Sequence, residues 1–173
     1  RDYGDRKDRA HARFKYTIDD KGLDWIKAEI ESRLGFAFAP ARTVAFTSNG
    51  DVLGWSESES GRSQFTLFIE NGRIANHPGL ALMDALLTIA RMHDGTFRLT
   101  PNQNLAIADV SREQRPVIQA LLEEYGLDGQ GGASAVRRNA MACVALPTCG
   151  LAMAESERYL PGLLSKIEML LAK

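Results

Sequence analysis

The order of predicted elements between residues 42 and 126 constrains the fold of this chain more than any other feature. Alternating apolar residues predict strands around 42–47 and 64–70. The second strand places three apolar residues on one face, Phe65, Leu67 and Ile69. A helix, two further strands and another helix follow. This order is typical of an α+β fold in which helices cover one face of a mainly antiparallel sheet.

An earlier amphipathic helix is predicted in GLDWIKAEIESRLG, before the first strand. Its apolar residues are spaced by three, four and four, at Leu23, Ile26, Ile30 and Leu34. Gly35 follows the last of them as a stop signal, so we expect the helix to end there.

Two more helices are predicted within the α+β region. Pro78 opens the first, in GLALMDALLTIARMHDG, and Gly95 follows its end. Its inward-facing residues are predicted to be Leu80, Met83, Leu86 or Leu87, and Ala90. The other, in SREQRPVIQALLEEYG, begins with a capping box of Ser111 and Gln114 and must hold Pro116 in its first turns.

Short polar segments predict the turns between strands. Asn-Gly pairs at 49–50 and 71–72 predict tight turns. The PNQN segment at 101–104 joins the last two predicted strands, TFRLT and NLAIADV.

Length and composition limit the class of protein. A chain of 173 residues with 45% hydrophobic and 25% charged residues can form one core or two small adjoining ones. The net charge of -1 argues against a general nucleic-acid binder. Because no apolar run reaches bilayer length and the first residues show neither an apolar h-region nor a cleavage site, we expect a cytoplasmic protein without membrane contact. A first residue other than methionine, Arg1, suggests a domain cut from a longer polypeptide.

Positive charge gathers in residues 1–16, where six Lys or Arg stand against three Asp. A solvated surface segment and a cationic arm that binds an anionic ligand are both open interpretations. Arg13 and Lys15 are two residues apart, so an extended backbone would point both side chains the same way.

The chain changes character after residue 126. Residues 127–135 are rich in glycine and predict a linker, because they lack the GK[ST] ending of a phosphate loop. Residues 136–173 hold a short apolar stretch with both cysteines, and then a helix with Met153, Tyr159, Leu163, Ile167 and Leu170. We interpret this last part as the beginning of a second domain.

Cys143 and Cys149 are the two cysteines of the chain. Two structural thiols, a reversible disulfide, half of a zinc site and half of an iron–sulfur site are four open interpretations. A structural disulfide is disfavoured in a reducing cytoplasm. Zinc usually takes four protein ligands, and His11, His77 and His93 lie far away in the sequence. A cubane iron–sulfur cluster needs four thiolates, so it would take two from elsewhere.

Four separated motifs then occur in the same order as in a known family: DRAHARFKYT, FIENGRI, FRLTPNQNLAIADV and ACVALPTCGLAMAESERYLP. With them the chain resembles, over nearly its whole length, the siroheme and 4Fe–4S hemoprotein (beta) subunits of assimilatory sulfite reductases, within the nitrite/sulfite reductase family. Family members contain a duplicated unit that pairs a ferredoxin-like half with a cluster domain. The resemblance implies the second copy, with a basic arm and connecting helix (1–36), a ferredoxin-like half-domain (37–126), the linker (127–135) and the start of a 4Fe–4S domain (136–173).

The resemblance also implies metal ligands. In the family a C-x5-C motif and a later C-x3-C motif bind the 4Fe–4S cluster, and the last thiolate bridges to the siroheme iron. Cys143 and Cys149 match the first pair, so the other two ligands are expected beyond Lys173.

Siroheme contacts are implied in the same way. Arg13 matches a basic family position at the cofactor, and Lys15 beside it could neutralise siroheme carboxylates. Gln103 matches a residue that touches siroheme, while Ala142 and Thr148 are expected to line the cluster and porphyrin side. Ala145, in contrast, stands where many relatives have serine or glycine, so no hydrogen bond from its side chain is expected.

The implied activity is reduction of sulfite to sulfide in six one-electron steps. It belongs to the parent polypeptide, and this chain alone is not expected to be active. The implied partners are the rest of the polypeptide, the substrate sulfite, and an electron donor that is either a flavoprotein subunit or a ferredoxin. Siroheme nitrite reductase is the alternative within the family. A non-catalytic α+β module that binds a small ligand, with Cys143 and Cys149 as a redox-sensing dithiol, is the alternative from another class.

Overall fold

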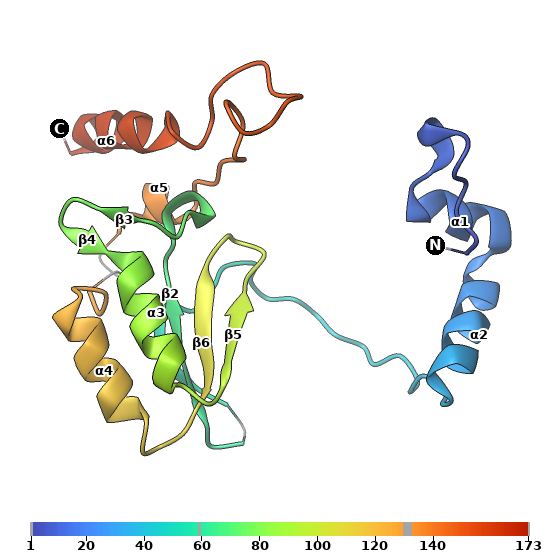
Figure 1. Cartoon of the computed structure of the whole chain (residues 1–173), viewed down its shortest axis with the longest axis horizontal. Helices are drawn as coiled ribbons and strands as arrows, with labels where there is room; N and C mark the ends of the chain where they lie inside the picture. Colours follow the sequence, from blue (N-terminus) through green and yellow to red (C-terminus); the bar gives the residue numbers. More distant parts are fainter. Residues whose placement is uncertain (1, 59, 130–132, 173) are drawn as a thin grey trace. The chain divides into compact units, whose positions relative to one another are not determined.

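The computed structural model describes residues 2–58, 60–129 and 133–172, and the chain forms two compact units, Arg1–Thr47 and Ser48–Lys173 (Figure 1). The regular structure described in the first unit is helical, and the second unit holds the sheets. The predicted domain boundaries at residues 36, 126 and 135 stay predictions.

The N-terminal unit holds three helical segments, η1 (Arg9–His11), α1 (Phe14–Lys21) and α2 (Leu23–Leu34). Helix α2 confirms the first predicted helix. Gly35 ends it in the left-handed conformation, with φ of 76°, and donates its backbone N–H to the carbonyl of Glu31. Ile26 is buried, but Leu23 and Leu34 are 69% and 47% exposed. The apolar stripe of α2 is therefore only partly covered within this unit.

Two predictions of extended backbone in this unit are wrong. Lys15 lies in the first turn of α1 and Arg13 is its N-cap, so the two side chains do not follow one extended arm. No strand forms at 42–47, and Phe46 is 93% exposed. An alternating sequence becomes a strand only where a neighbouring strand takes up its backbone hydrogen bonds. The described part of this unit contains no such strand.

Four antiparallel strands form the main sheet of the C-terminal unit, in the order β1-β2-β6-β5. They are β1 (Gly54–Glu57), β2 (Ser63–Leu67), β5 (Thr96–Leu99) and β6 (Leu105–Val110). Helices α3 (Leu82–Met92) and α4 (Arg115–Glu124) cover one face of the sheet (Figure 1). A short hairpin of β3 (Asn76–His77) and β4 (Leu80–Ala81) precedes α3. The predicted α+β fold class is confirmed.

The hydrophobic core of this unit lies between the sheet and helices α3 and α4. Ile107, on the inner strand β6, is fully buried and pairs with Phe65 of β2 and Phe97 of β5. The helices contribute fully buried residues such as Ile89 and Leu122. Leu127, the first residue of the predicted linker, is also in this core, and residues 130–132 of that linker lie outside the described residues.

Helix α3 differs from the prediction in its start and in its buried face. It begins at Leu82 and not at Pro78, because the β3–β4 hairpin, with Gly79 at a φ of 80°, occupies the preceding residues. The buried residues of α3 are Leu82, Ala85, Leu86 and Ile89. Of the predicted inward residues, Leu86 is buried, and Leu80 packs against the core from β4, outside the helix. Met83, Leu87 and Ala90 are exposed, so those three predictions were wrong. Helix α3 carries apolar residues on two adjoining stripes, and tertiary packing selects one of them.

Helix α4 confirms the last predicted helix of the α+β region, with Pro116 in its first turn. The Oγ of Ser111 accepts the backbone N–H of Gln114 at 3.2 Å, as the capping box predicts. The amide of Gln114 does not return to Ser111, however, and donates to the carbonyl of Met92 at 3.0 Å. Half of the predicted capping box is therefore formed.

The predicted turns have different outcomes. Asn71 and Gly72 both have positive φ, 55° and 68°, and form the expected tight turn within η2 (Glu70–Gly72). The turn at 101–104 is confirmed as well, with Gln103 at a φ of 64°. The segment at 49–50 forms no hydrogen-bonded turn, so that prediction was wrong.

The end of the chain consists of α5 (Ala135–Arg138), an irregular segment at 139–159, and α6 (Leu160–Leu171). Helix α6 confirms the predicted terminal helix, although Tyr159 is its N-cap and Met153, 99% exposed, lies outside it. Arg137 joins these elements, because its guanidinium pairs with Glu168 of α6 at 2.7 Å and also with Glu70 of η2. This contact fixes α5 and α6 beside η2.

Candidate functional site

The two cysteines lie on a compact loop between α5 and α6. Cys143 is exposed, Cys149 is half-buried, and both are free thiols. The backbone N–H of Cys149 donates to the carbonyl of Ala145 at 2.8 Å, which closes the loop between the cysteines. Thr148 is exposed on this loop, next to Cys149. The loop therefore presents one accessible thiol and one partly shielded thiol.

The turn after β5 holds this loop through one side-chain contact. Gln103 donates from Nε2 to the carbonyl of Ala142 at 2.9 Å, immediately before Cys143. A hollow of about 400 Å³ lies here and is lined by Gly72, Gln103, Ala142 and Val144, among others. The Oε1 of Gln103 is buried and has no hydrogen-bond partner among the described residues. The structure thus brings predicted site residues that are far apart in sequence, Gln103 and Ala142, to one hollow.

Asp51 organises the turn that carries Gln103. Its carboxylate accepts hydrogen bonds from Thr100 Oγ1 at 2.6 Å, Asn104 Nδ2 at 2.8 Å and Asn102 Nδ2 at 3.2 Å. Partial burial by itself would raise the pKa of Asp51, but these three hydrogen bonds outweigh it and hold the pKa below its ordinary value. Sequence analysis did not identify Asp51, and no local signal marks it.

This arrangement predicts a pH-dependent stability of the turn. Because the pKa of Asp51 is lower in the folded state, its contribution is fully present above the ordinary value of 3.8 and is lost as the pH falls through the folded pKa. The Asp51→Asn variant should lose about 1–3 kcal/mol of local stability at neutral pH and most of this pH dependence. Hydrogen exchange of the Ile69 amide, which donates to Asn104 Oδ1 at 2.9 Å, measures both effects after correction for intrinsic rates. Equal pH profiles for the variant and the wild type would contradict the prediction.

Arg13 and Lys15, the predicted cationic residues, belong to the N-terminal unit. Both side chains are exposed, and the Nζ of Lys15 lies 4.8 Å from the ring centroid of Tyr16. Neither residue lines the hollow of about 290 Å³ in this unit. Their predicted role toward an anionic cofactor stays a prediction.

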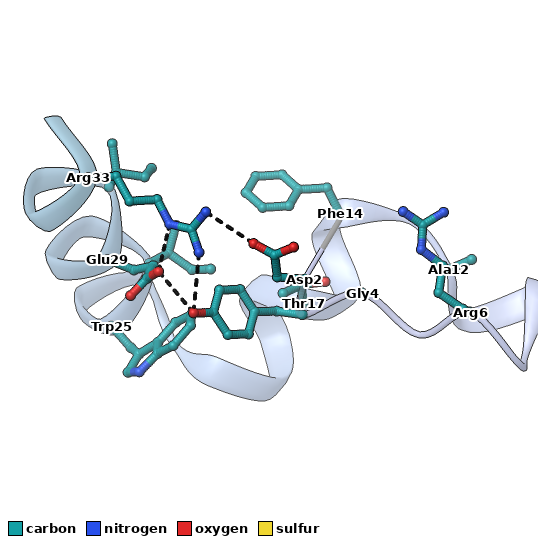
Figure 2. Close-up of a pocket in the computed structure, with 12 residues that line it drawn as sticks. Asp2, Gly4, Arg6, Ala12, Phe14, Thr17, Trp25, Glu29 and Arg33 are labelled. Carbon is teal, nitrogen blue, oxygen red and sulfur yellow. Dashed lines mark hydrogen bonds and ion pairs between the residues drawn. The ribbon is translucent and has the colours of Figure 1, made fainter.

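Arg33 forms the ion pairs at the hollow of the N-terminal unit. Arg33 pairs with both Glu29 and Asp2 (Figure 2), at 2.7 Å and 3.1 Å respectively. The hydroxyl of Tyr3 donates to Glu29 at 2.9 Å. Hydrogen bonds from Arg33 and Tyr3 hold the pKa of Glu29 below its ordinary value. The edge of Tyr3 also meets the ring of Trp25, with centroids 4.9 Å apart. The guanidinium of Arg33 is thus already paired with carboxylates of its own unit.

Two absences apply to the described ranges. Within 2–58, 60–129 and 133–172, no group of three or more His, Cys, Asp or Glu side chains is placed to hold a metal ion. No helix in this part of the chain is long and apolar enough to cross a membrane. Cys143 and Cys149 therefore do not complete a metal site with other described residues.

Comparison with known proteins decides the family. The model of the nitrite/sulfite reductase ferredoxin-like half domain matches residues 57–125, and the model of the nitrite and sulphite reductase 4Fe-4S domain matches residues 1–38. A sulfite reductase [NADPH] hemoprotein beta-component from Afipia carboxidovorans is 68% identical over 173 residues, which is all of this chain and 30% of that protein. The chain belongs to the nitrite and sulfite reductase family. The predicted resemblance is confirmed.

Other comparisons in the family agree. A protein of the same name from Staphylococcus carnosus is 57% identical over 99% of this chain and 30% of its own length. The solved structure of the NirA protein of Mycobacterium tuberculosis matches with a TM-score of 0.68 and 27% identity, over 98% of this chain and 30% of that one. The chain thus spans about 30% of the length of these family members. The family match at 1–38 also covers a segment that sequence analysis interpreted as a basic arm and connecting helix.

Proposed function

We propose that the polypeptide containing this chain reduces sulfite to sulfide with siroheme and a 4Fe–4S cluster. The observation that carries the proposal is the pair of free cysteines at C-x5-C spacing on a loop that Gln103 joins to the ferredoxin-like sheet. Relatives that are 57–68% identical along this chain are named sulfite reductase hemoproteins, which supports the same assignment.

Cys143 and Cys149 supply two of the four cluster thiolates in this proposal. Thiolates suit an iron–sulfur core because they are soft, charge-donating ligands. The accessible Cys143 and the half-buried Cys149 are free thiols and can supply two of the four thiolates. The other two would come from residues outside this chain.

Siroheme contacts are proposed for Gln103 and Ala142, and for Thr148 on the cysteine loop. The unpartnered Oε1 of Gln103 fits a polar group or a water at the cofactor's edge, next to Ala142 and the hollow. Thr148, exposed beside Cys149, is proposed to contact the cofactors as well. Arg13 and Lys15 carry the charge that siroheme carboxylates require.

Siroheme and the cluster, when bound, supply the electron transfer, and the residues of the chain bind and orient them. Sulfite takes up six electrons and protons, and its three oxygen atoms leave as water. We propose that the electrons come from a separate partner subunit that oxidises NADPH, because the relatives are named NADPH-dependent beta-components. A ferredoxin is the alternative donor.

Turnover of the natural full-length polypeptide, purified anaerobically, tests this function. With a chemically reduced dye as donor, we expect sulfide to form with six electrons consumed per sulfite, and faster than nitrite is reduced. Met153→Leu, on the same loop with a 99% exposed side chain, should leave the rate unchanged. Preferential reduction of nitrite would indicate the other substrate of the family, and no turnover of either anion would contradict the proposal.

A further inference from the structure

Glu157 connects the cysteine loop to the ferredoxin-like half through all three of its polar groups. Its backbone N–H donates to the carbonyl of Cys143 at 3.2 Å. Its own carbonyl accepts a hydrogen bond from Asn71 Nδ2 at 3.0 Å. Its carboxylate binds the guanidinium of Arg73, with Nε to Oε1 at 2.5 Å and Nη2 to Oε2 at 2.7 Å. One residue thus contacts a predicted metal ligand on one side and η2 on the other.

The Arg73–Glu157 pair is more than an ordinary surface ion pair. It is bidentate, which fixes the relative orientation of the two side chains. The side chain of Glu157 is only 12% exposed, whereas that of Arg73 is 47% exposed. Loss of Arg73 would leave a shielded carboxylate without its partner, which is costly, while fully exposed pairs contribute little.

The turn in η2 explains why both donors reach Glu157. Asn71 and Gly72 have φ of 55° and 68°, so the backbone reverses there and the flanking side chains of Asn71 and Arg73 meet the same residue. Gly72 also lies close to the Gln103 turn, because a Cβ at this position would be 3.2 Å from the Cβ of Gln103, a tight contact. The η2 turn and the Gln103 turn are therefore in contact beside the cysteine loop.

Two successive carbonyls at the first cysteine are held, one by the Gln103 turn and the other by Glu157, which Asn71 and Arg73 bind. Gln103 binds the carbonyl of Ala142, and Glu157 binds the carbonyl of Cys143. Fixing both carbonyls orients the peptide on each side of the Cys143 Cα, and so sets the direction of its Cα–Cβ bond. Metal sites depend on such outer contacts to orient their ligands.

We propose that Arg73 and Asn71, acting through Glu157, are positioning residues that orient Cys143 for the iron–sulfur cluster. The proposal rests on the proposed function, in which Cys143 is a cluster ligand. In this proposal Arg73 and Asn71 act through Glu157 and are not themselves cluster ligands, so their loss changes the geometry of a ligand without removing it.

Variants of the full-length polypeptide test the role with two independent readouts. In the cofactor-free form, Arg73→Gln should raise hydrogen exchange of the Glu157 amide about tenfold. This amide donates to the Cys143 carbonyl only while Arg73 and Asn71 hold Glu157 in place. In the cofactor-loaded form, the same variant should shift the reduction potential and the electron paramagnetic resonance spectrum of the cluster. Arg73→Lys keeps the charge and loses the bidentate contact. Its hydrogen exchange and its cluster properties should therefore lie between those of the wild type and of Arg73→Gln.

Arg98→Gln is the matched control. Arg98 pairs with Asp109 at 2.7 Å on neighbouring strands β5 and β6, and neither residue contacts the cysteine loop. We expect both readouts to stay at wild-type values in this variant. Unchanged exchange at Glu157 in Arg73→Gln, or equal effects of the two glutamine variants, would overturn the positioning role. A wild-type polypeptide without any cluster would instead contradict the proposed function. The exchange measurement would still show whether Arg73 holds Glu157 against Cys143.

Discussion

Serine in place of Cys143 or Cys149 is expected to abolish sulfite reduction by the full-length polypeptide. Removing either thiolate removes a direct ligand of the cluster, and serine oxygen is a poor substitute for the soft sulfur donor. The loss of turnover should exceed the roughly 10–100-fold that changes in outer contacts of metal sites cause. Steady-state sulfide production measures it.

Two controls separate this effect from damage to the loop. Met153→Leu changes an exposed residue of the same loop and should keep the wild-type rate. Arg73→Gln changes an outer contact of the loop and should cost far less turnover than either cysteine variant. A Cys143→Ser variant that retains more than about a tenth of the wild-type rate would show that Cys143 is not a ligand.

Ile89→Ala is expected to lower the free energy of unfolding of the C-terminal unit by about 2–5 kcal/mol. Ile89 is fully buried between α3 and the sheet, so the substitution leaves a cavity in a packed core. Limited proteolysis of the full-length polypeptide across a urea series measures the change without relying on turnover.

Leu87→Ala, two residues away on the same helix, is the matched control. Leu87 is 50% exposed on the adjoining, outer stripe of α3, so its truncation should cost clearly less, under about 1 kcal/mol. Equal losses for the two variants would mean that α3 buries both stripes. That result would contradict the packing of α3 described here.

Local patterns were enough to predict most elements and the fold class. The three-and-four spacing located α2 and its end at Gly35, because a left-handed glycine stop is encoded within the helix's own last turn. Strands β2 and β6 and their helical neighbours followed from alternation and turn residues, and their order gave the α+β class.

Errors arose where tertiary contacts override a local pattern. The segment at 42–47 alternates like a strand but has no neighbouring strand in its unit. Helix α3 has two apolar stripes, and only the position of the sheet decides which one is buried. Pro78 was predicted to begin a helix, but the residues around it form the β3–β4 hairpin.

The residues of the candidate site could be predicted only where a sequence motif marks them. Cys143, Cys149 and Gln103 were identified from motifs, and the structure places Gln103 against the cysteine loop. Glu157 and its partner Arg73 are separated by 84 residues, and Asp51 and Asn104 by 53. Such contacts have no periodicity or local spacing, so they emerge only once the chain is folded.

The cofactor content of the natural polypeptide tests the central claim most directly. We would purify it anaerobically and measure its iron, its siroheme and its visible absorption, beside the Cys143→Ser variant. The account predicts siroheme and iron–sulfur absorption in the wild type, with iron for one 4Fe–4S cluster and one siroheme, and loss of the cluster iron in the variant. A wild-type protein without iron or visible absorption, in which Cys143 and Cys149 form a reversible disulfide, would contradict it.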